Sequence, residues 1–183
     1  MSSPDKTPKL GLFHRGFDRL YPAIRFTYEK VLGQVWFTQI EPQIWLGGAP
    51  SYQRDLDELL KMGITAVVDL RAERDAAADF FTRNGIALRQ YRVPDTTVPG
   101  PDVLSDAVPW ISARIADGSV VLIHCAKGRG RSATVLAAYL MTTEGLSFGD
   151  VQGLLQSKRP LVKLDTRHQR VLELWLESQR AAN

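Results

Sequence analysis

Two short apolar runs, residues 64–70 and 119–124, constrain the fold of this 183-residue chain more than any other feature. Both are rich in β-branched and aliphatic residues, which is typical of strands buried on both faces of a parallel sheet. Helical patterns lie between and after them, over residues 73–83, 102–116 and 131–143. Strands that alternate with helices predict an α/β domain with a mainly parallel central sheet flanked by helices.

The same patterns divide the chain into two parts. Residues 35–183 are expected to form the folded domain, because 44% of the chain is hydrophobic and this is enough for an ordinary core. Residues 1–34 are expected to form a basic N-terminal arm, with a disordered start and then a helix over residues 22–32.

The arm holds an uneven share of the charge. Between Lys6 and Lys30, six basic residues outnumber two acidic ones, so this stretch carries +4 and the rest of a chain of net charge +3 carries −1. A basic segment rich in aromatic residues can lie on an anionic membrane surface. The alternative is a helix packed on the domain with a solvated basic face.

Several protein classes are disfavoured by the composition. No apolar run approaches the roughly 20 residues of a membrane span, and the first residues lack the apolar region of a secretory signal. The single cysteine excludes an intramolecular disulfide and fits a reducing compartment. We therefore expect a cytoplasmic protein, with peripheral membrane contact through the arm as a variant of that expectation, and no nucleic acid partner.

The segment that begins at the last residue of the second apolar run has the composition of an anion-binding loop. It reads His124-Cys125-Ala126-Lys127-Gly128-Arg129-Gly130-Arg131-Ser132. Its two glycines allow successive amides to turn inward, and the helix that follows adds the positive end of its dipole. The Gly-Lys-Ser/Thr ending of a nucleotide-binding P-loop is missing. Phosphate is expected to bind at Ala126, Lys127, Gly128, Arg129 and Gly130.

Two side chains in this segment suit phosphoryl transfer. A thiol at Cys125 would lie in a positive field, which lowers its pKa and favours the nucleophilic thiolate. Arg131, six positions later, carries a planar guanidinium that can bind two phosphoryl oxygens at once. A cysteine after an apolar strand is by itself more often a core residue. The loop glycines and the Arg-Ser pair at a helix start favour catalysis here.

Residues 124–132 match the pattern His-Cys-x-x-Gly-x-x-Arg-Ser. This resembles the signature of the protein tyrosine phosphatase superfamily and, by size, its dual-specificity branch, over about residues 35–178. The segment Ile44-Trp45-Leu46-Gly47-Gly48-Ala49-Pro50, with Trp36 and Ile40 before it, is similar to the mitochondrial-type phosphatidylglycerophosphate phosphatases and their bacterial relatives. The resemblance implies a Cys-based phosphatase fold and a phosphocysteine intermediate, without a metal or other cofactor.

The resemblance also implies roles for single residues. Cys125 would attack phosphorus, Arg131 would bind the phosphoryl group, and Ser132 would donate a hydrogen bond to the sulfur. His124 would orient the loop from beneath and tune the thiolate.

The family needs an aspartate on a mobile loop as general acid, about 30 residues before the cysteine. Asp95 fits, because it follows residues 87–93, whose alternating pattern predicts a strand, and precedes a Pro/Gly-rich stretch. Asp102 and Asp106 are the alternatives, each better explained as a helix cap or a solvated side chain. Asp69 is expected to brace the site through Arg71.

A weaker resemblance covers the stretch that begins at Arg159-Pro160. Relatives carry a polar residue after it that supports the phosphate loop or positions water, and the usual asparagine is replaced here by Asp165. The candidates are Asp165, His168 and Gln169, with Gln169 expected as a supporting residue.

Three functions remain open from the sequence. The first is a dual-specificity phosphatase acting on phosphorylated proteins. The second is a lipid phosphatase acting on phosphatidylglycerophosphate or phosphoinositides, since Lys127 and Arg129 would favour a highly anionic head group. The third is an interaction module that binds phosphate groups with little or no turnover.

Overall fold

The computed structural model describes residues 25–31, 33, 35–74 and 76–182, and the chain divides into two units, residues 1–36 and 37–183. In the first unit a short π-helix, η1, spans Thr27–Val31. Next to it, the buried Arg25 donates a hydrogen bond of 2.7 Å to Glu29 and lies 4.5 Å from the centre of the Trp36 ring. The disordered start and most of the arm that we expected lie outside the described residues.

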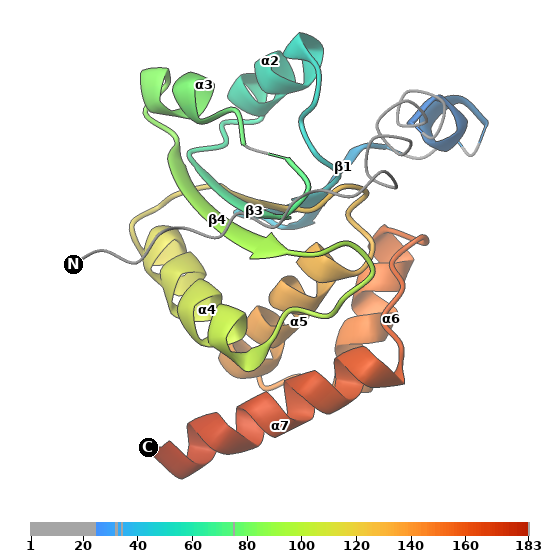
Figure 1. The fold of residues 1–183 in the computed structure, drawn as a ribbon, viewed down its shortest axis with the longest axis vertical. Coiled ribbons are helices and arrows are strands. Elements are labelled where there is room, and N and C mark those ends of the chain that lie inside the picture. The colour runs from blue at the N-terminus through green and yellow to red at the C-terminus, as the bar shows by residue number, and fades with distance from the viewer. Residues whose placement is uncertain (1–24, 32, 34, 75, 183) are drawn as a thin grey trace. The chain divides into compact units, whose positions relative to one another are not determined.

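The second unit is built on a five-stranded sheet with the order β1-β2-β5-β3-β4 (Figure 1). Every neighbouring pair is parallel except β1 and β2. The predicted α/β class with a mainly parallel sheet is therefore confirmed. The strands are β1 (Phe37–Glu41), β2 (Ile44–Gly47), β3 (Ala66–Arg71), β4 (Ala87–Val93) and β5 (Val121–His124).

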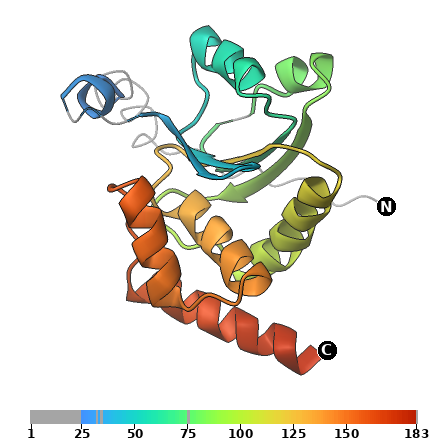
Figure 2. The same ribbon diagram turned by 180° about the vertical axis from the view of Figure 1, so that it is seen from behind.

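Helices cover both faces of this sheet (Figures 1 and 2). On one face lie α2 (Gln53–Lys61) and α3 (Ala78–Arg83), and on the other lie α4 (Pro101–Ala116), α5 (Arg131–Thr143), α6 (Phe148–Lys158) and α7 (Thr166–Ala182). The central helix α5 is buried from Arg131 to Met141 because it packs on the sheet and on its neighbouring helices. Among the described residues, no helix is both long and apolar enough to cross a membrane.

Two elements differ from what the sequence predicts. The helix expected over residues 73–83 begins only at Ala78, so Glu73 lies in the loop after β3. Strand β1 was not predicted, because a β-bulge between Gln39 and Glu41 breaks the alternation of buried and exposed side chains. As a result Phe37 and Ile40, three residues apart, are both buried.

The carboxyl ends of the parallel strands define where a site can form. Ligands of open α/β sheets bind beyond these ends, where loops from neighbouring strands meet. Here the loops after β3, β4 and β5 carry Glu73, Asp95 and Cys125 respectively.

Candidate active site

The loop from β5 to α5 is shaped by one close backbone contact. Gly128 has φ +67°, a left-handed conformation, and a Cβ at this position would lie 2.5 Å from the backbone of Gly47 at the end of β2. Only glycine fits both the conformation and the approach. The loop is therefore packed against the sheet, which limits its freedom to change shape.

A buried arginine from the α6–α7 connection holds the same loop. Arg159 donates from Nε to the Gly128 carbonyl at 3.0 Å and from Nη2 to the Lys127 carbonyl at 3.1 Å. Its Nη1 donates to the Thr38 hydroxyl of β1 at 2.9 Å. The sequence pointed to this stretch but did not indicate that Arg159 reaches the loop.

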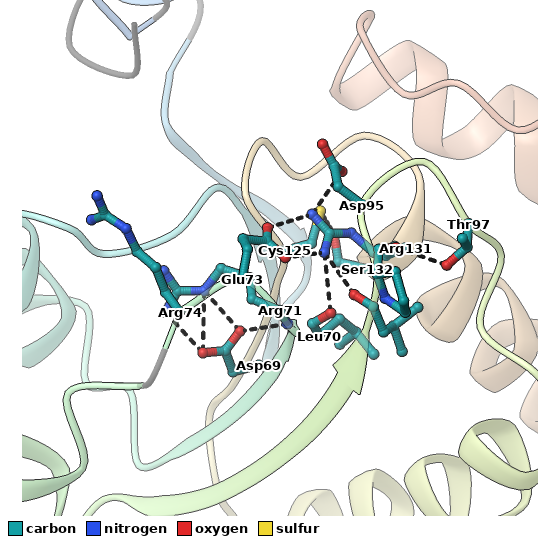
Figure 3. Close-up of polar contacts among 12 residues, drawn as sticks. Asp69, Leu70, Arg71, Glu73, Arg74, Asp95, Thr97, Cys125, Arg131 and Ser132 are labelled. Carbon is teal, nitrogen blue, oxygen red and sulfur yellow. Dashed lines mark hydrogen bonds and ion pairs between the residues drawn. The ribbon is translucent and has the colours of Figure 1, made fainter. Parts of the chain in front are cut away.

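Cys125 lies at the base of the loop and is buried. Its Sγ accepts a hydrogen bond of 3.3 Å from the Ser132 hydroxyl (Figure 3). Burial by itself raises the pKa of the thiol, but the Arg131 guanidinium, the Ser132 hydroxyl and the amides of Ser132 and Lys127 outweigh it, and the pKa is lowered. These surroundings therefore stabilise the thiolate more than water stabilises that of a free cysteine.

Arg131, the first residue of α5, is held in place by two carboxylates and the backbone. Both terminal nitrogens donate to Glu73 at 2.8 Å, and Nη2 also donates to Asp95 at 2.8 Å (Figure 3). Nη1 donates to the Val93 carbonyl at 2.9 Å. Burial lowers the pKa of Arg131, but its hydrogen bonds to Glu73 and the charge of Cys125 raise the pKa by more, so the guanidinium stays charged.

Glu73 is a site residue that sequence reasoning missed. The sequence predicts that Glu73 lies in a helix over residues 73–83. No local pattern relates it to Arg131, which lies 58 positions later. Burial raises the pKa of its carboxyl, but the hydrogen bonds and charge of Arg131 lower it more, so the carboxylate is stabilised.

Of the three aspartates considered as general acid, only Asp95 lines the cavity above Cys125. Asp106 instead accepts hydrogen bonds from Arg89 and Tyr91 on an exposed surface, and Asp102 lies exposed in the first turn of α4. The residue after Asp95, Thr96, has φ +65°, so the chain turns sharply here and directs this loop over the cavity.

The residues expected beneath the loop lie together. His124 is fully buried, with Nδ1 3.4 Å from the Cys125 carbonyl and 3.8 Å from Asp69. Asp69 accepts hydrogen bonds from the amide, Nε and Nη2 of Arg71, between 2.8 and 3.2 Å. Burial lowers the pKa of His124 to about 4, although the charge of Asp69 opposes it, so the ring is neutral near pH 7.

The structure brings Asp165 and His168 to the cavity, but not Gln169. The Gln169 amide donates instead to Glu173 at 2.9 Å, along the exposed side of α7. The polar side chains at this point of the site are therefore those of Asp165 and His168, and not that of Gln169, which the sequence favoured.

These groups enclose one cavity of about 320 Å³. It is lined by Asp95, Thr96, Thr97, Cys125, Ala126, Lys127, Arg129, Gly130, Arg131, Lys163, Asp165, Arg167 and His168. In the part of the chain that the structure describes, no group of three or more His, Cys, Asp or Glu side chains is arranged to hold a metal ion. The arrangement provides a nucleophile, a cationic anion-binding group and a carboxyl group within one small space.

Comparison with known proteins gives consistent matches. The family model described as "Dual specificity phosphatase, catalytic domain" matches residues 44–178. Dual specificity protein phosphatase 12 of Homo sapiens is 31% identical over 141 residues, which cover 75% of this chain and 40% of that protein. The matched part of this chain thus spans 40% of the length of that relative.

Two further matches bear on the fold and the subgroup. Phosphatidylglycerophosphate phosphatase PTPMT2 of Arabidopsis thaliana is 25% identical over 157 residues, covering 84% of this chain and 68% of that protein. The crystal structure of Tk-PTP in the active form has 31% sequence identity and a TM-score of 0.71, covering 78% of this chain and 97% of that one. The Cys-based phosphatase fold expected from the resemblance is thereby confirmed.

Proposed function

The chain belongs to the dual-specificity phosphatases, a family of Cys-dependent phosphatases, and from this premise we propose that it hydrolyses phosphate monoesters through a phosphocysteine on Cys125. One observation supports this proposal above all others. A buried sulfur with a lowered pKa lies at the base of a cavity whose wall carries the charged guanidinium of Arg131.

The first chemical step transfers the phosphoryl group to sulfur. The loop amides and Arg131 bind the phosphoryl oxygens, which places phosphorus in front of the Cys125 thiolate. The thiolate attacks as the bond to the leaving oxygen breaks, and the carboxyl group of Asp95 donates a proton to that oxygen. Asp95 suits this role because it lines the same cavity as Cys125, and its Oδ1 lies 2.8 Å from Arg131 Nη2, the nitrogen from which a bound phosphoryl oxygen would displace it.

The second step hydrolyses the phosphocysteine. Water attacks phosphorus and the bonding pair returns to Sγ, where the Ser132 hydroxyl and the amides of Lys127 and Ser132 stabilise the thiolate. The Asp95 carboxylate, which has lost its proton in the first step, is the base that the family resemblance implies.

A lipid substrate is the second candidate, supported by the charge around the cavity. Besides Arg131, its lining includes Lys127, Arg129, Lys163 and Arg167, whereas the acidic residues of the lining are Asp95 and Asp165. A head group with more than one negative charge would be attracted by this excess. One relative is named a phosphatidylglycerophosphate phosphatase and another a protein phosphatase, so both substrate classes occur in the family.

The two substrate classes can be separated by direct competition. Turnover of a phosphotyrosine peptide and of phosphatidylglycerophosphate in vesicles is measured side by side, with and without residues 1–34. Preference for the lipid, weakened by removal of the arm, supports a lipid phosphatase with peripheral membrane contact. Preference for the peptide, unchanged by that truncation, supports a phosphoprotein phosphatase.

The proposed activity itself is tested with para-nitrophenyl phosphate. We expect the wild type to release phosphate and Cys125→Ser to release none. If the wild type binds phosphate without turnover, the chain is a phosphate-binding module instead.

A further inference from the structure

The carbonyl groups of the phosphate loop, residues 126–130, all accept hydrogen bonds from residues outside it. The donors are the Ala49 amide to Ala126 at 3.2 Å, the Arg159 guanidinium to Lys127 and Gly128, the Lys163 amide to Arg129 at 2.9 Å, and the Thr134 amide and hydroxyl to Gly130 at 2.8 and 3.0 Å. In a trans peptide the carbonyl and the following amide point in opposite directions. Donors that hold the carbonyls therefore also fix the direction of the amides of residues 127–131.

Arg159 is the side chain that holds two of these carbonyls. It is only 1% exposed, and its Nε and Nη2 reach the Gly128 and Lys127 carbonyls at 3.0 and 3.1 Å. Its Nη1 donates to the Thr38 hydroxyl of β1 at 2.9 Å, which ties the guanidinium to the sheet. Because the guanidinium is a rigid planar fork, it fixes two successive peptide planes at once.

The peptides held by Arg159 differ from the one that contacts the sulfur. The Lys127 amide, which stabilises the Cys125 thiolate together with the Ser132 amide, belongs to the preceding peptide. The carbonyl of that peptide is held by the Ala49 amide instead. The loop amides thus fall into a group that serves the sulfur and a group that Arg159 orients.

We propose that Arg159 is a positioning residue of the anion site, which directs the amides of Gly128 and Arg129 at the phosphoryl oxygens by holding the carbonyls behind them. Hydrogen bonds to an anion are strong but weaken steeply when the donor turns away. Loss of Arg159 then weakens oxyanion binding and leaves the thiolate in place. The inference rests on the proposed function only in that the cavity binds a phosphoryl group.

The test measures the affinity for tungstate, a tetrahedral oxyanion, by titration calorimetry without turnover. Arg159→Met keeps an apolar stem in the buried space but has no donor. We expect its dissociation constant to be at least about tenfold above that of the wild type. Arg159→Lys keeps the charge without the planar fork, so a smaller rise of about threefold or more is expected. Circular dichroism shows whether each variant is folded, and Arg159→Lys decides if Arg159→Met is not.

A second readout separates positioning from a general distortion of the loop. Cys125 is the single cysteine of the chain, so the rate of alkylation by iodoacetamide reports its thiolate alone. The pH midpoint of this rate should be the same in the wild type and in the folded Arg159 variants. Lys158→Met is the matched control, because Lys158 precedes Arg159 but donates to the Ile40 carbonyl of β1, and it should bind tungstate like the wild type.

Different outcomes overturn different claims. If the folded Arg159 variants bind tungstate as tightly as the wild type, or if Lys158→Met loses as much affinity, this inference fails. It also fails if the alkylation midpoint moves to higher pH together with the loss of affinity, since the loop would then be distorted as a whole. If the wild type binds tungstate, the variants behave as expected and para-nitrophenyl phosphate is not hydrolysed, the proposed function fails and this inference stands.

Discussion

Glu73 and Arg131 form a two-point ion pair, in which each terminal nitrogen of the guanidinium donates to a different carboxylate oxygen at 2.8 Å. The pair joins the loop after β3 to the first residue of α5. Because both groups are planar, two parallel hydrogen bonds fix the plane of the guanidinium as well as its position. The orientation of the Arg131 guanidinium is thus set by a residue outside the loop from β5 to α5.

Replacing Glu73 by Gln should impair catalysis without removing a reacting group. The amide keeps the shape of the side chain but can accept only one of the two hydrogen bonds, so the guanidinium loses its fixed plane. We expect kcat/KM for para-nitrophenyl phosphate to fall about 10- to 100-fold, as small misplacements of catalytic groups do. Asp79→Asn, on the exposed side of α3, is the matched control. Equal activity of the two variants would contradict the positioning role.

Replacing Arg131 by Lys tests whether charge alone is sufficient. Lysine keeps the positive charge but cannot donate to two phosphoryl oxygens in one plane. We expect kcat to fall by about 10² to 10³, the usual loss when one donor to a transition-state oxygen is removed. A variant that retains most of the wild-type kcat would show that the site needs only a cation.

Replacing Asp95 by Asn should have an effect that depends on the leaving group. A poor leaving group, such as an alkyl alcohol, needs the proton, whereas para-nitrophenolate leaves readily without it. We expect a loss of about 10²- to 10⁴-fold with alkyl phosphates and a much smaller one with para-nitrophenyl phosphate. A uniform loss across a series of leaving groups would argue that Asp95 acts in binding instead.

The buried His124 should make stability depend on pH. Burial lowers its pKa from 6.5 to about 4, so between these values the unfolded chain binds a proton that the folded chain does not. The contribution of the neutral ring is present above pH 6.5 and is lost as the pH falls toward 4, by up to about 3 kcal/mol. Urea denaturation between pH 7 and 4.5 should therefore show a smaller loss in His124→Asn than in the wild type. Parallel curves would contradict a buried neutral ring.

The parts of the site that are continuous in sequence were the predictable ones. A buried strand, two glycines and an Arg-Ser pair lie within 14 residues, and β5, the loop and α5 follow this pattern closely. Asp95 could also be predicted from the sequence, because a strand that ends at Val93 places the next residues at the same edge of the sheet.

The residues that were missed depend on packing between distant segments. Glu73 and Arg159 reach the site only because the fold brings the end of β3 and the end of α6 to the loop after β5. His168 and Gln169 are neighbours in a helix, where successive side chains point about 100° apart. One therefore faces the cavity and the other faces solvent, and the sequence alone does not distinguish them.

The central claim concerns the sulfur of Cys125, and trapping the intermediate tests it most directly. The protein is mixed with para-nitrophenyl phosphate, quenched in acid during turnover and analysed by peptide mass spectrometry. The account predicts a phosphoryl group on Cys125 in the wild type and neither label nor turnover in Cys125→Ser. Turnover that persists in Cys125→Ser, or a phosphoryl group on another residue, would contradict it.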